Sequence, residues 1–213
     1  MPTLDARSWP AHAAPPMMVS EPWWLFSKAI SADACDRIVE LGLSHVRERG
    51  IGRTDNLDDE RQTWIAWIRE DWVYKLVEPF IHAANVQAEW RFDVERMQSL
   101  QFGIYDVGGR YDWHRDMTGR PYSAKDPVSE TFHGLLRKIS YSLQLSEPTS
   151  YDGGDLELEA GVPGNTERAE KADPERARGT MIVFPAFIPH RITAVTRGVR
   201  YSLVGWLCGK PWR

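Results

Sequence analysis

The stretch Lys138-Ile139-Ser140-Tyr141-Ser142-Leu143-Gln144-Leu145 alternates strictly between polar and apolar residues. A period of two indicates a β-strand, because successive side chains of a strand point to opposite faces of the sheet. Similar alternation or a short apolar run recurs at 100–104, 155–159, 181–184 and 200–207. Because turns containing glycine and proline separate these segments, they predict an antiparallel sandwich or barrel.

The N-terminal half shows helical spacing instead. A first helix is predicted between Ser31, a favourable N-cap, and Gly50, with the acidic Asp33 in its first turn. Its apolar positions are Ala34, Ile38 and Leu41. A second helix is predicted from about Asp71 to Ala88, where Pro79 should kink it or mark a restart. Its apolar stripe comprises Trp72, Leu76, Phe80 and Ala84. The fold class is therefore α+β, mainly β, with two or three N-terminal helices packed on a C-terminal β-unit.

Composition limits the class of protein further. The chain has 213 residues, of which 42% are hydrophobic and 26% charged, typical of a globular domain. A formal net charge of -4 gives no indication of a surface that binds polyanions. Only two cysteines are present, far apart, and they are expected to be reduced thiols. Without a signal-peptide pattern or an apolar run of about 18 residues, a cytoplasmic protein with no membrane span is expected.

Two kinds of segment are expected besides the core. Residues 1–22 are rich in proline and are interpreted as a flexible or strap-like N-terminal arm, followed by a single domain over 23–213. Residues 50–62 and 161–179 are interpreted as loops because they are rich in charged and small residues. Trp64, Trp67 and Trp72 lie at near-helical spacing and are expected in the core. Asp155, Glu157 and Glu159 are interpreted as the solvated face of a strand rather than a metal cluster.

A possible metal site follows the strand that begins at Leu100. A turn at 106–110 precedes Tyr111-Asp112-Trp113-His114-Arg115-Asp116, which reads as extended. His114 and Asp116 would then share one face of a strand, as two neighbouring ligands of one metal must. His190 lies 76 residues after His114, behind Pro189, which fixes the local turn. Two histidines and one carboxylate are the facial triad that binds non-haem Fe(II) and leaves coordination positions open.

A second group of residues lies on the last predicted strand. Arg200, Ser202, Val204 and Trp206 share one face of it. An arginine inside a barrel is costly unless it meets an anion, and a carboxylate would satisfy it in bidentate geometry. A ligand with a chelating end and a distal carboxylate would fit both groups.

This ordered set of motifs resembles the Fe(II)- and 2-oxoglutarate-dependent dioxygenases, in particular their prolyl-4-hydroxylase-like group. The matching segments are 26–31 with Cys35-Asp36, then 101–109, 111–116, 137–140, 151–156 and 179–206. The resemblance runs from about Trp24 to the C-terminus. It implies a double-stranded β-helix, or jelly roll, with the N-terminal helices packed on it.

The resemblance also implies roles for single residues. His114, Asp116 and His190 would bind iron, and Arg200 would hold the C5 carboxylate of 2-oxoglutarate. The further contacts to the cosubstrate or its pocket would come from Tyr105, Ser202 and Trp206. Because position 116 carries a carboxylate rather than Ala or Gly, hydroxylation is favoured over halogenation. The implied reaction hydroxylates an aliphatic C–H, of a prolyl residue in a protein or peptide or of a free amino acid. It converts 2-oxoglutarate and O₂ to succinate and CO₂, with ascorbate as an accessory cofactor.

Some alternatives stay open at this point. The chain could be a non-catalytic metal-binding jelly roll, although such a module has no need of the buried Arg200. It could also be a nucleic-acid demethylase with the same cofactors, against which the acidic balance weighs. Arg137 and Lys138 could reach the substrate or lie on the surface. Residues 115–134 are a hypothetical lid, and with 161–179 they are expected to determine the substrate.

Overall fold

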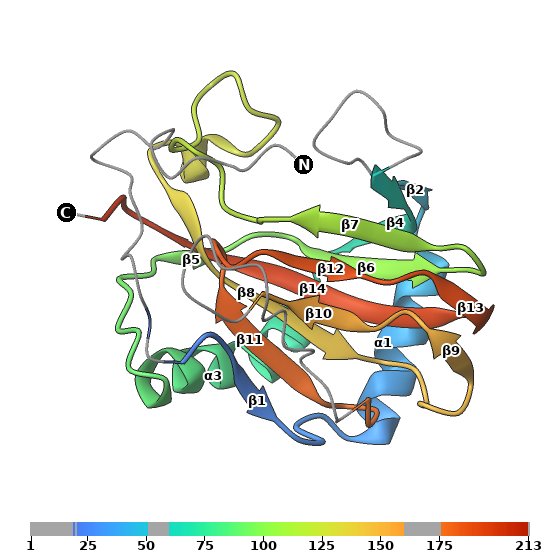
Figure 1. Ribbon diagram of the computed structural model, residues 1–213. Coiled ribbons are helices and arrows are strands. Elements are labelled where there is room, and N and C mark those ends of the chain that lie inside the picture. Colours follow the sequence, from blue (N-terminus) through green and yellow to red (C-terminus); the bar gives the residue numbers. More distant parts are fainter. Residues whose placement is uncertain (1–18, 20, 51–59, 160–175, 213) are drawn as a thin grey trace.

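The computed structural model describes residues 19, 21–50, 60–159 and 176–212 as three antiparallel sheets and two long helices (Figure 1). The eight-stranded sheet contains, in spatial order, β1 (Trp24–Phe26), β11 (Met181–Pro185), β8 (Leu136–Gln144), β14 (Arg200–Gly209), β6 (Leu100–Tyr105), β4 (Trp64–Ile68) and β2 (Glu48–Arg49), and β5 (Arg96–Met97) pairs with β14. The four-stranded sheet contains β10 (Leu156–Leu158), β12 (His190–Ile192), β7 (Arg110–His114) and β3 (Arg61–Gln62). A third sheet pairs β13 (Val195–Gly198) with β9 (Tyr151–Gly153).

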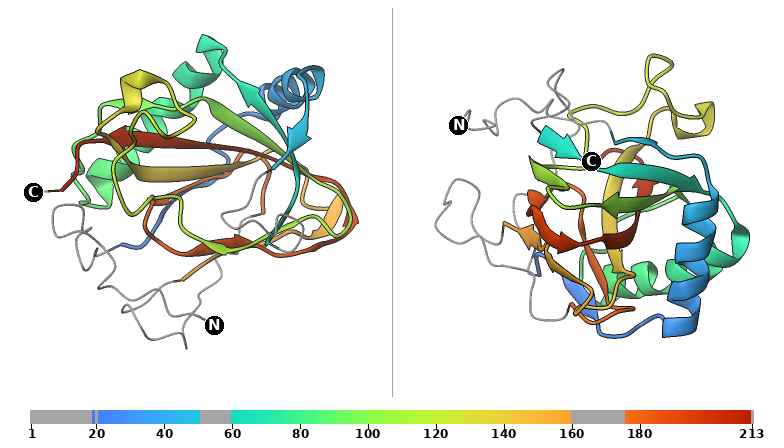
Figure 2. Two further views of the ribbon diagram at one scale, coloured as in Figure 1. Left: turned by 90° about the horizontal axis from the view of Figure 1, so that it is seen from above. Right: turned by 90° about the vertical axis from the view of Figure 1, so that its right-hand side faces the viewer.

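Helices α1 (Ala32–Ser44) and α3 (Asp71–Gln87) cover the outer face of the eight-stranded sheet (Figure 2). Their buried side chains join those of β6, β8 and β14 in one hydrophobic core. The four-stranded sheet lies over the opposite face, so that the central strands of the large sheet are covered on both sides. The mainly β fold with helices packed on a jelly roll is confirmed.

Both predicted helices are present, with differences at their ends and faces. Ser31 caps α1 by accepting a hydrogen bond from the Ala34 amide at 3.2 Å, but the helix ends at Ser44 rather than near Gly50. It ends there because Glu48 and Arg49 pair with β4. Helix α3 runs continuously through Pro79, so the expected restart is wrong. Its fully buried apolar side chains are Val73, Val77, Ile81 and Ala84. The first three each lie one residue after a predicted position, and Ala84 is buried as predicted.

The prediction that Trp64 and Trp67 are core residues is wrong. They lie in strand β4, where residues three apart point to opposite faces. Trp64 is 37% exposed beneath the guanidinium of Arg49, and Trp67 lines the cavity described below. Trp72 packs against the core as expected, although it is only partly buried.

Strand β8 explains why the alternating stretch of sequence decides the fold. Its apolar residues Ile139 and Leu143 enter the core shared with the helices. Its polar residues Ser140, Ser142 and Gln144 are also buried, because they face the space between the two sheets. The polar face of this strand is therefore an interior surface that can hold a polar site.

The remaining expectations concern loops and charges. Glu157 is not on a solvated face: it is only 7% exposed and lies 2.6 Å from Nε of Arg191 on β12. Burial is possible because Arg191 neutralises the carboxylate. From the expected arm, Val19 packs on the core, whereas residues 1–18 and 20 lie outside the described residues. Of the expected loops, 51–59 and 161–175 also lie outside them, and Arg61–Gln62 form β3 rather than a loop. In the described part, no helix is long and apolar enough to cross a membrane.

Candidate active site

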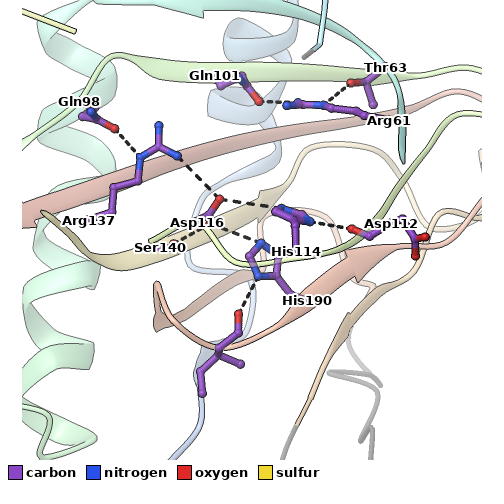
Figure 3. A network of polar contacts seen from close by, with 11 residues as sticks. Arg61, Thr63, Gln98, Gln101, Asp112, His114, Asp116, Arg137, Ser140 and His190 are labelled. Carbon is purple, nitrogen blue, oxygen red and sulfur yellow. Dashed lines mark hydrogen bonds and ion pairs between the residues drawn. The ribbon is translucent and has the colours of Figure 1, made fainter. Parts of the chain in front are cut away.

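The three predicted metal ligands meet between the two sheets. His114 ends β7 and pairs directly with His190 of β12, so the two imidazoles lie side by side. Asp116 follows two residues after His114 and turns its carboxylate between them (Figure 3). Its Oδ2 lies 3.4 Å from His190 Nε2 and its Oδ1 lies 3.9 Å from His114 Nε2. One ligand atom from each residue lies within 4.8 Å of the others, so the group could hold a metal ion.

Backbone carbonyls set the orientation of both imidazoles. Nδ1 of His114 lies 2.8 Å from the Asp112 carbonyl oxygen, and Nδ1 of His190 lies 3.0 Å from that of Ile188. A carbonyl oxygen can only accept, so each Nδ1 carries the proton and donates it. The Nε2 lone pairs are thereby left free toward Asp116, which is the arrangement that metal-binding histidines need.

The charge states also suit a metal. Burial, and to a smaller extent the neighbouring His190, lower the pKa of His114 to about 3. Burial alone would raise the pKa of Asp116, but His190, His114 and Arg137 outweigh it and hold that pKa well below its usual range. A neutral imidazole and an ionised carboxylate are the forms that bind metal, so binding would not have to displace protons from these two residues.

Ser140 was not singled out by its sequence, yet it orients the predicted carboxylate ligand. Its hydroxyl, on the interior face of β8, donates to Oδ2 of Asp116 at 2.7 Å. We expect Ser140→Ala to weaken Fe(II) binding by roughly 10- to 100-fold, as loss of a partner that orients a metal ligand does. Equilibrium dialysis with Fe(II) under anaerobic conditions would measure the change.

Ser142 provides the matched control for this substitution. It lies on the same face of the same strand, and its buried hydroxyl has no hydrogen-bond partner among the described residues. Ser142→Ala should therefore leave the metal affinity unchanged. Equal losses in both variants would mean that Ser140 acts through packing rather than through Asp116.

Arg200 supplies a buried cation next to the cavity-lining Tyr105, on the face of β14 that also carries Ser202. The side chain has no exposed surface, and its guanidinium lies 5.2 Å from the ring centre of Tyr105, its partner in the β6–β14 register. Nη2 donates to Gln144 Oε1 at 3.0 Å, whereas Nε and Nη1 have no hydrogen-bond partner within the described ranges. The hydroxyl of Ser202 is equally without a partner there. Such a group of unsatisfied buried donors fits a carboxylate, which accepts several hydrogen bonds.

A cavity of about 310 Å³ contains the triad. Both sheets contribute to its walls, and the predicted Tyr105, Ser202 and Trp206 all line it. Arg61 lines it as well, tied to Thr63 Oγ1 at 2.8 Å and Gln101 Oε1 at 2.7 Å (Figure 3). Its guanidinium also lies over the ring of Tyr111, which stacks on His114.

The site residues missed by sequence reasoning are Ser140, Gln144, Arg61, Gln101 and Trp67. Alternation in β8 was a usable signal for the first two, since a polar face inside a central strand must find partners. Asp155 and Glu159 take no part in a metal cluster among the described residues.

A jelly roll that holds two histidines, a carboxylate and a buried arginine between its sheets is typical of non-haem iron oxygenases that use a 2-oxo acid. The family model described as the 2OG-Fe(II) oxygenase superfamily matches residues 100–208, just over half of the chain. The chain therefore belongs to the 2OG-Fe(II) oxygenase superfamily.

Curated relatives of the chain are named as PKHD-type hydroxylases. The protein from Synechococcus sp. (strain JA-2-3B'a(2-13)) is 35% identical over 112 residues, which cover 52% of this chain and 43% of the relative. That from Bordetella pertussis is 32% identical over 106 residues, covering 50% and 41%. The match thus spans less than half the length of these relatives.

Solved structures share the fold at low identity. A viral collagen prolyl hydroxylase from Paramecium bursaria Chlorella virus-1 has a TM-score of 0.62 at 15% identity, covering 89% of this chain and 97% of that one. A Pseudomonas putida prolyl-4-hydroxylase has a TM-score of 0.58 at 22% identity, covering 88% and 92%. Because the identities are low, these likenesses concern the fold.

Proposed function

We propose that this protein is an Fe(II)- and 2-oxoglutarate-dependent dioxygenase that hydroxylates an aliphatic C–H. The observation that carries the proposal is a His-Asp-His group in a cavity lined by Tyr105, together with a buried arginine over that tyrosine whose Nε and Nη1 lack partners among the described residues. A simple metal-binding module would gain nothing from that arginine, which is costly to bury. Membership of the superfamily supports the same cofactor and cosubstrate.

Each residue of the site would have its own role in this reaction. His114, Asp116 and His190 would hold Fe(II), and Arg200 with Ser202 would hold the distal carboxylate of 2-oxoglutarate. Bound together, Fe(II), 2-oxoglutarate and O₂ supply the oxidising chemistry that inserts oxygen into the C–H and yields succinate and CO₂. Ascorbate would maintain the iron in its reduced state.

The walls of the cavity have a separate part in this function. Leu156, Phe184 and Ile192 line it with apolar surface, which excludes water from the reacting centre. Asp116 would fill a coordination position of the iron with a carboxylate, which would leave no place for a halide and supports hydroxylation. The substrate is a prolyl residue, a free amino acid or another small molecule within this proposal.

Succinate formation tests the proposal directly. Purified protein with Fe(II), 2-oxoglutarate, ascorbate and air should release succinate, and chelation of iron should stop the release. Iron binding without any succinate, with or without candidate substrates, would leave only the metal-binding jelly roll. Stimulation by oligonucleotides rather than by amino acids or peptides would favour the demethylase alternative.

Two further parts of the proposal concern access of the substrate to the cavity and the cellular location of the protein. The hypothetical lid 115–134 begins at the cavity, which Arg115, Met117 and Thr118 line. The Met117 amide donates to the Ala186 carbonyl at 2.9 Å. Protection of 115–134 from limited proteolysis by 2-oxoglutarate with Mn(II) would support a lid.

A cytoplasmic location is proposed from Cys35 and Cys208, which are both buried and unpaired.

A further inference from the structure

Besides Arg61 and Arg115, Arg137 on strand β8 lines the same cavity. Arg137 lies over the ring of Trp206 on β14, with its guanidinium carbon 3.7 Å from the ring centre. Its Nε donates to Gln98 Oε1 at 2.7 Å, and the Gln98 amide in turn donates to the Trp206 carbonyl at 3.0 Å. The guanidinium is therefore fixed in place before any ligand arrives, although its side chain is still 21% exposed.

A β-bulge directs this arginine into the cavity. In the pairing of β14 with β8, Leu207 lies opposite Ile139, but the next residue, Cys208, lies opposite Arg137. Lys138 is therefore an extra residue on β8 without a partner on β14. With strict alternation, Arg137 would share the face of Ile139 and enter the core. Bulges change the direction of side chains in this way next to active sites.

Few negative charges would remain to neutralise Arg137 once Fe(II) and 2-oxoglutarate are bound. Within the described part of the chain, Asp116 is the only acidic side chain within 4 Å of Arg137, and its Oδ1 lies 3.9 Å from Nη1, beyond hydrogen-bond distance. In the loaded site, Fe(II) and Arg200 would together neutralise Asp116 and the two carboxylates of 2-oxoglutarate. Arg137 would then be a fixed, partly desolvated cation without a counter-ion.

Size limits what can supply that counter-ion. The cavity of about 310 Å³ is at the small end of ligand sites, which enclose roughly 300–1,000 Å³, and it must also receive 2-oxoglutarate. An anion bound to the Nη atoms of Arg137 would lie beside Asp116. The carbon that is oxidised would therefore be only a few bonds from that anion in the substrate. The middle of a polypeptide carries no such charge on its backbone.

We propose that Arg137 binds a carboxylate of the substrate, and that the substrate is a small carboxylic acid of about the size of a free amino acid. This inference rests on the proposed function and narrows it. The planar guanidinium suits a bidentate carboxylate, and its fixed position on Trp206 reduces the entropy lost on binding.

Proton relaxation of simple probes tests this without knowledge of the natural substrate. The protein is loaded with Mn(II) in place of Fe(II) and with saturating 2-oxoglutarate, which occupies Arg200. Propionate, propionamide and an uncharged capped prolyl peptide are then added separately, and paramagnetic relaxation of their methyl protons is measured. We expect propionate to relax about tenfold or more faster than the two uncharged probes, as a charge-assisted hydrogen bond of about 1.5 kcal/mol or more requires.

Variants separate binding at Arg137 from other causes. Arg137→Gln should reduce the relaxation of propionate to the level of propionamide, whereas Arg137→Lys, which keeps the charge, should retain part of the difference. Arg69→Gln is the matched control, because Arg69 is an exposed arginine that bonds Ser99 at 3.1 Å, and it should leave the difference intact. Circular dichroism would show that the variants are folded.

Three results would overturn the inference. Equal relaxation of propionate and propionamide would remove the carboxylate preference, and stronger relaxation of the prolyl peptide would make the substrate class wrong. A propionate effect that survives Arg137→Gln would mean that the acid binds elsewhere in the cavity, at the metal or at Arg61 or Arg115. Relaxation of the 2-oxoglutarate protons is read in the same samples: if it is absent, the proposed function itself fails, and if it is present, only the inference is at stake.

Discussion

His114→Ala is expected to abolish iron-dependent succinate formation. The substitution removes one of the three proposed ligand atoms, from a residue that is 7% exposed and whose imidazole is oriented by the Asp112 carbonyl. Loss of a partner that only orients a ligand costs roughly 10- to 100-fold in metal affinity, so loss of the ligand itself should cost more than about 100-fold. Anaerobic equilibrium dialysis with Fe(II) and a succinate assay in air would measure both effects.

His82→Ala is the control for this result. His82 lies on α3 with its side chain 51% exposed, 3.5 Å from Glu78, and has no part in the site. This variant should keep both iron binding and turnover. If His114→Ala instead turned over at the wild-type rate, His114 would leave the ligand set and the proposed function would lose its main support.

Arg200→Met is expected to change cosubstrate binding and stability in opposite directions. It removes the cation that would hold the distal carboxylate, so the KM for 2-oxoglutarate should rise by roughly 30-fold or more, from a loss of about 2 kcal/mol or more. It also removes a buried charge that lacks a counter-ion among the described residues, and the free energy of unfolding of the cosubstrate-free protein should rise by about 1 kcal/mol or more. Steady-state kinetics and urea denaturation would measure the two quantities.

Two companion variants make the stability result interpretable. Arg200→Met leaves Oε1 of Gln144 without the Arg200 donor, so the double variant with Gln144→Leu should show the full gain. Arg191→Met should have the opposite sign, because it takes the Arg191 partner from the buried Glu157. A fall in stability for the Arg200 double variant would show that this arginine is satisfied in the free protein, against the cosubstrate-anchor role.

The sequence predicted the parts of the fold whose physics is local. Strict alternation over 138–145 identified β8, and Ser31 identified the start of α1, since both patterns depend on neighbours in the chain. The β-strand β4 was missed because its sequence Trp64-Ile65-Ala66-Trp67-Ile68 is apolar on both faces and does not alternate. Strand β12 was missed because three residues are too few to show a period.

The site was predictable to a similar degree. The order of His114, Asp116, His190 and Arg200 indicated which residues come together, because facial triads and carboxylate anchors need fixed residue types. Ser140 and Gln144 could be placed on one face but not assigned partners, since those partners come from other strands. The bulge at Lys138 depends on the pairing of two strands far apart in the chain, so the sequence left open whether Arg137 reaches the substrate or lies on the surface.

The direct pairing of His114 with His190 has a consequence for folding as well as for catalysis. These two positions are 76 residues apart in the chain and meet only when β7 and β12 have come together. A metal ion held by both would cross-link the two strands, and it would bind the folded protein far better than the unfolded chain. Metal at about 100 times its dissociation constant would then add about 2.7 kcal/mol to the free energy of unfolding. The melting temperature would therefore report the occupancy of the iron site. In a cell short of iron, the protein would have a lower free energy of unfolding.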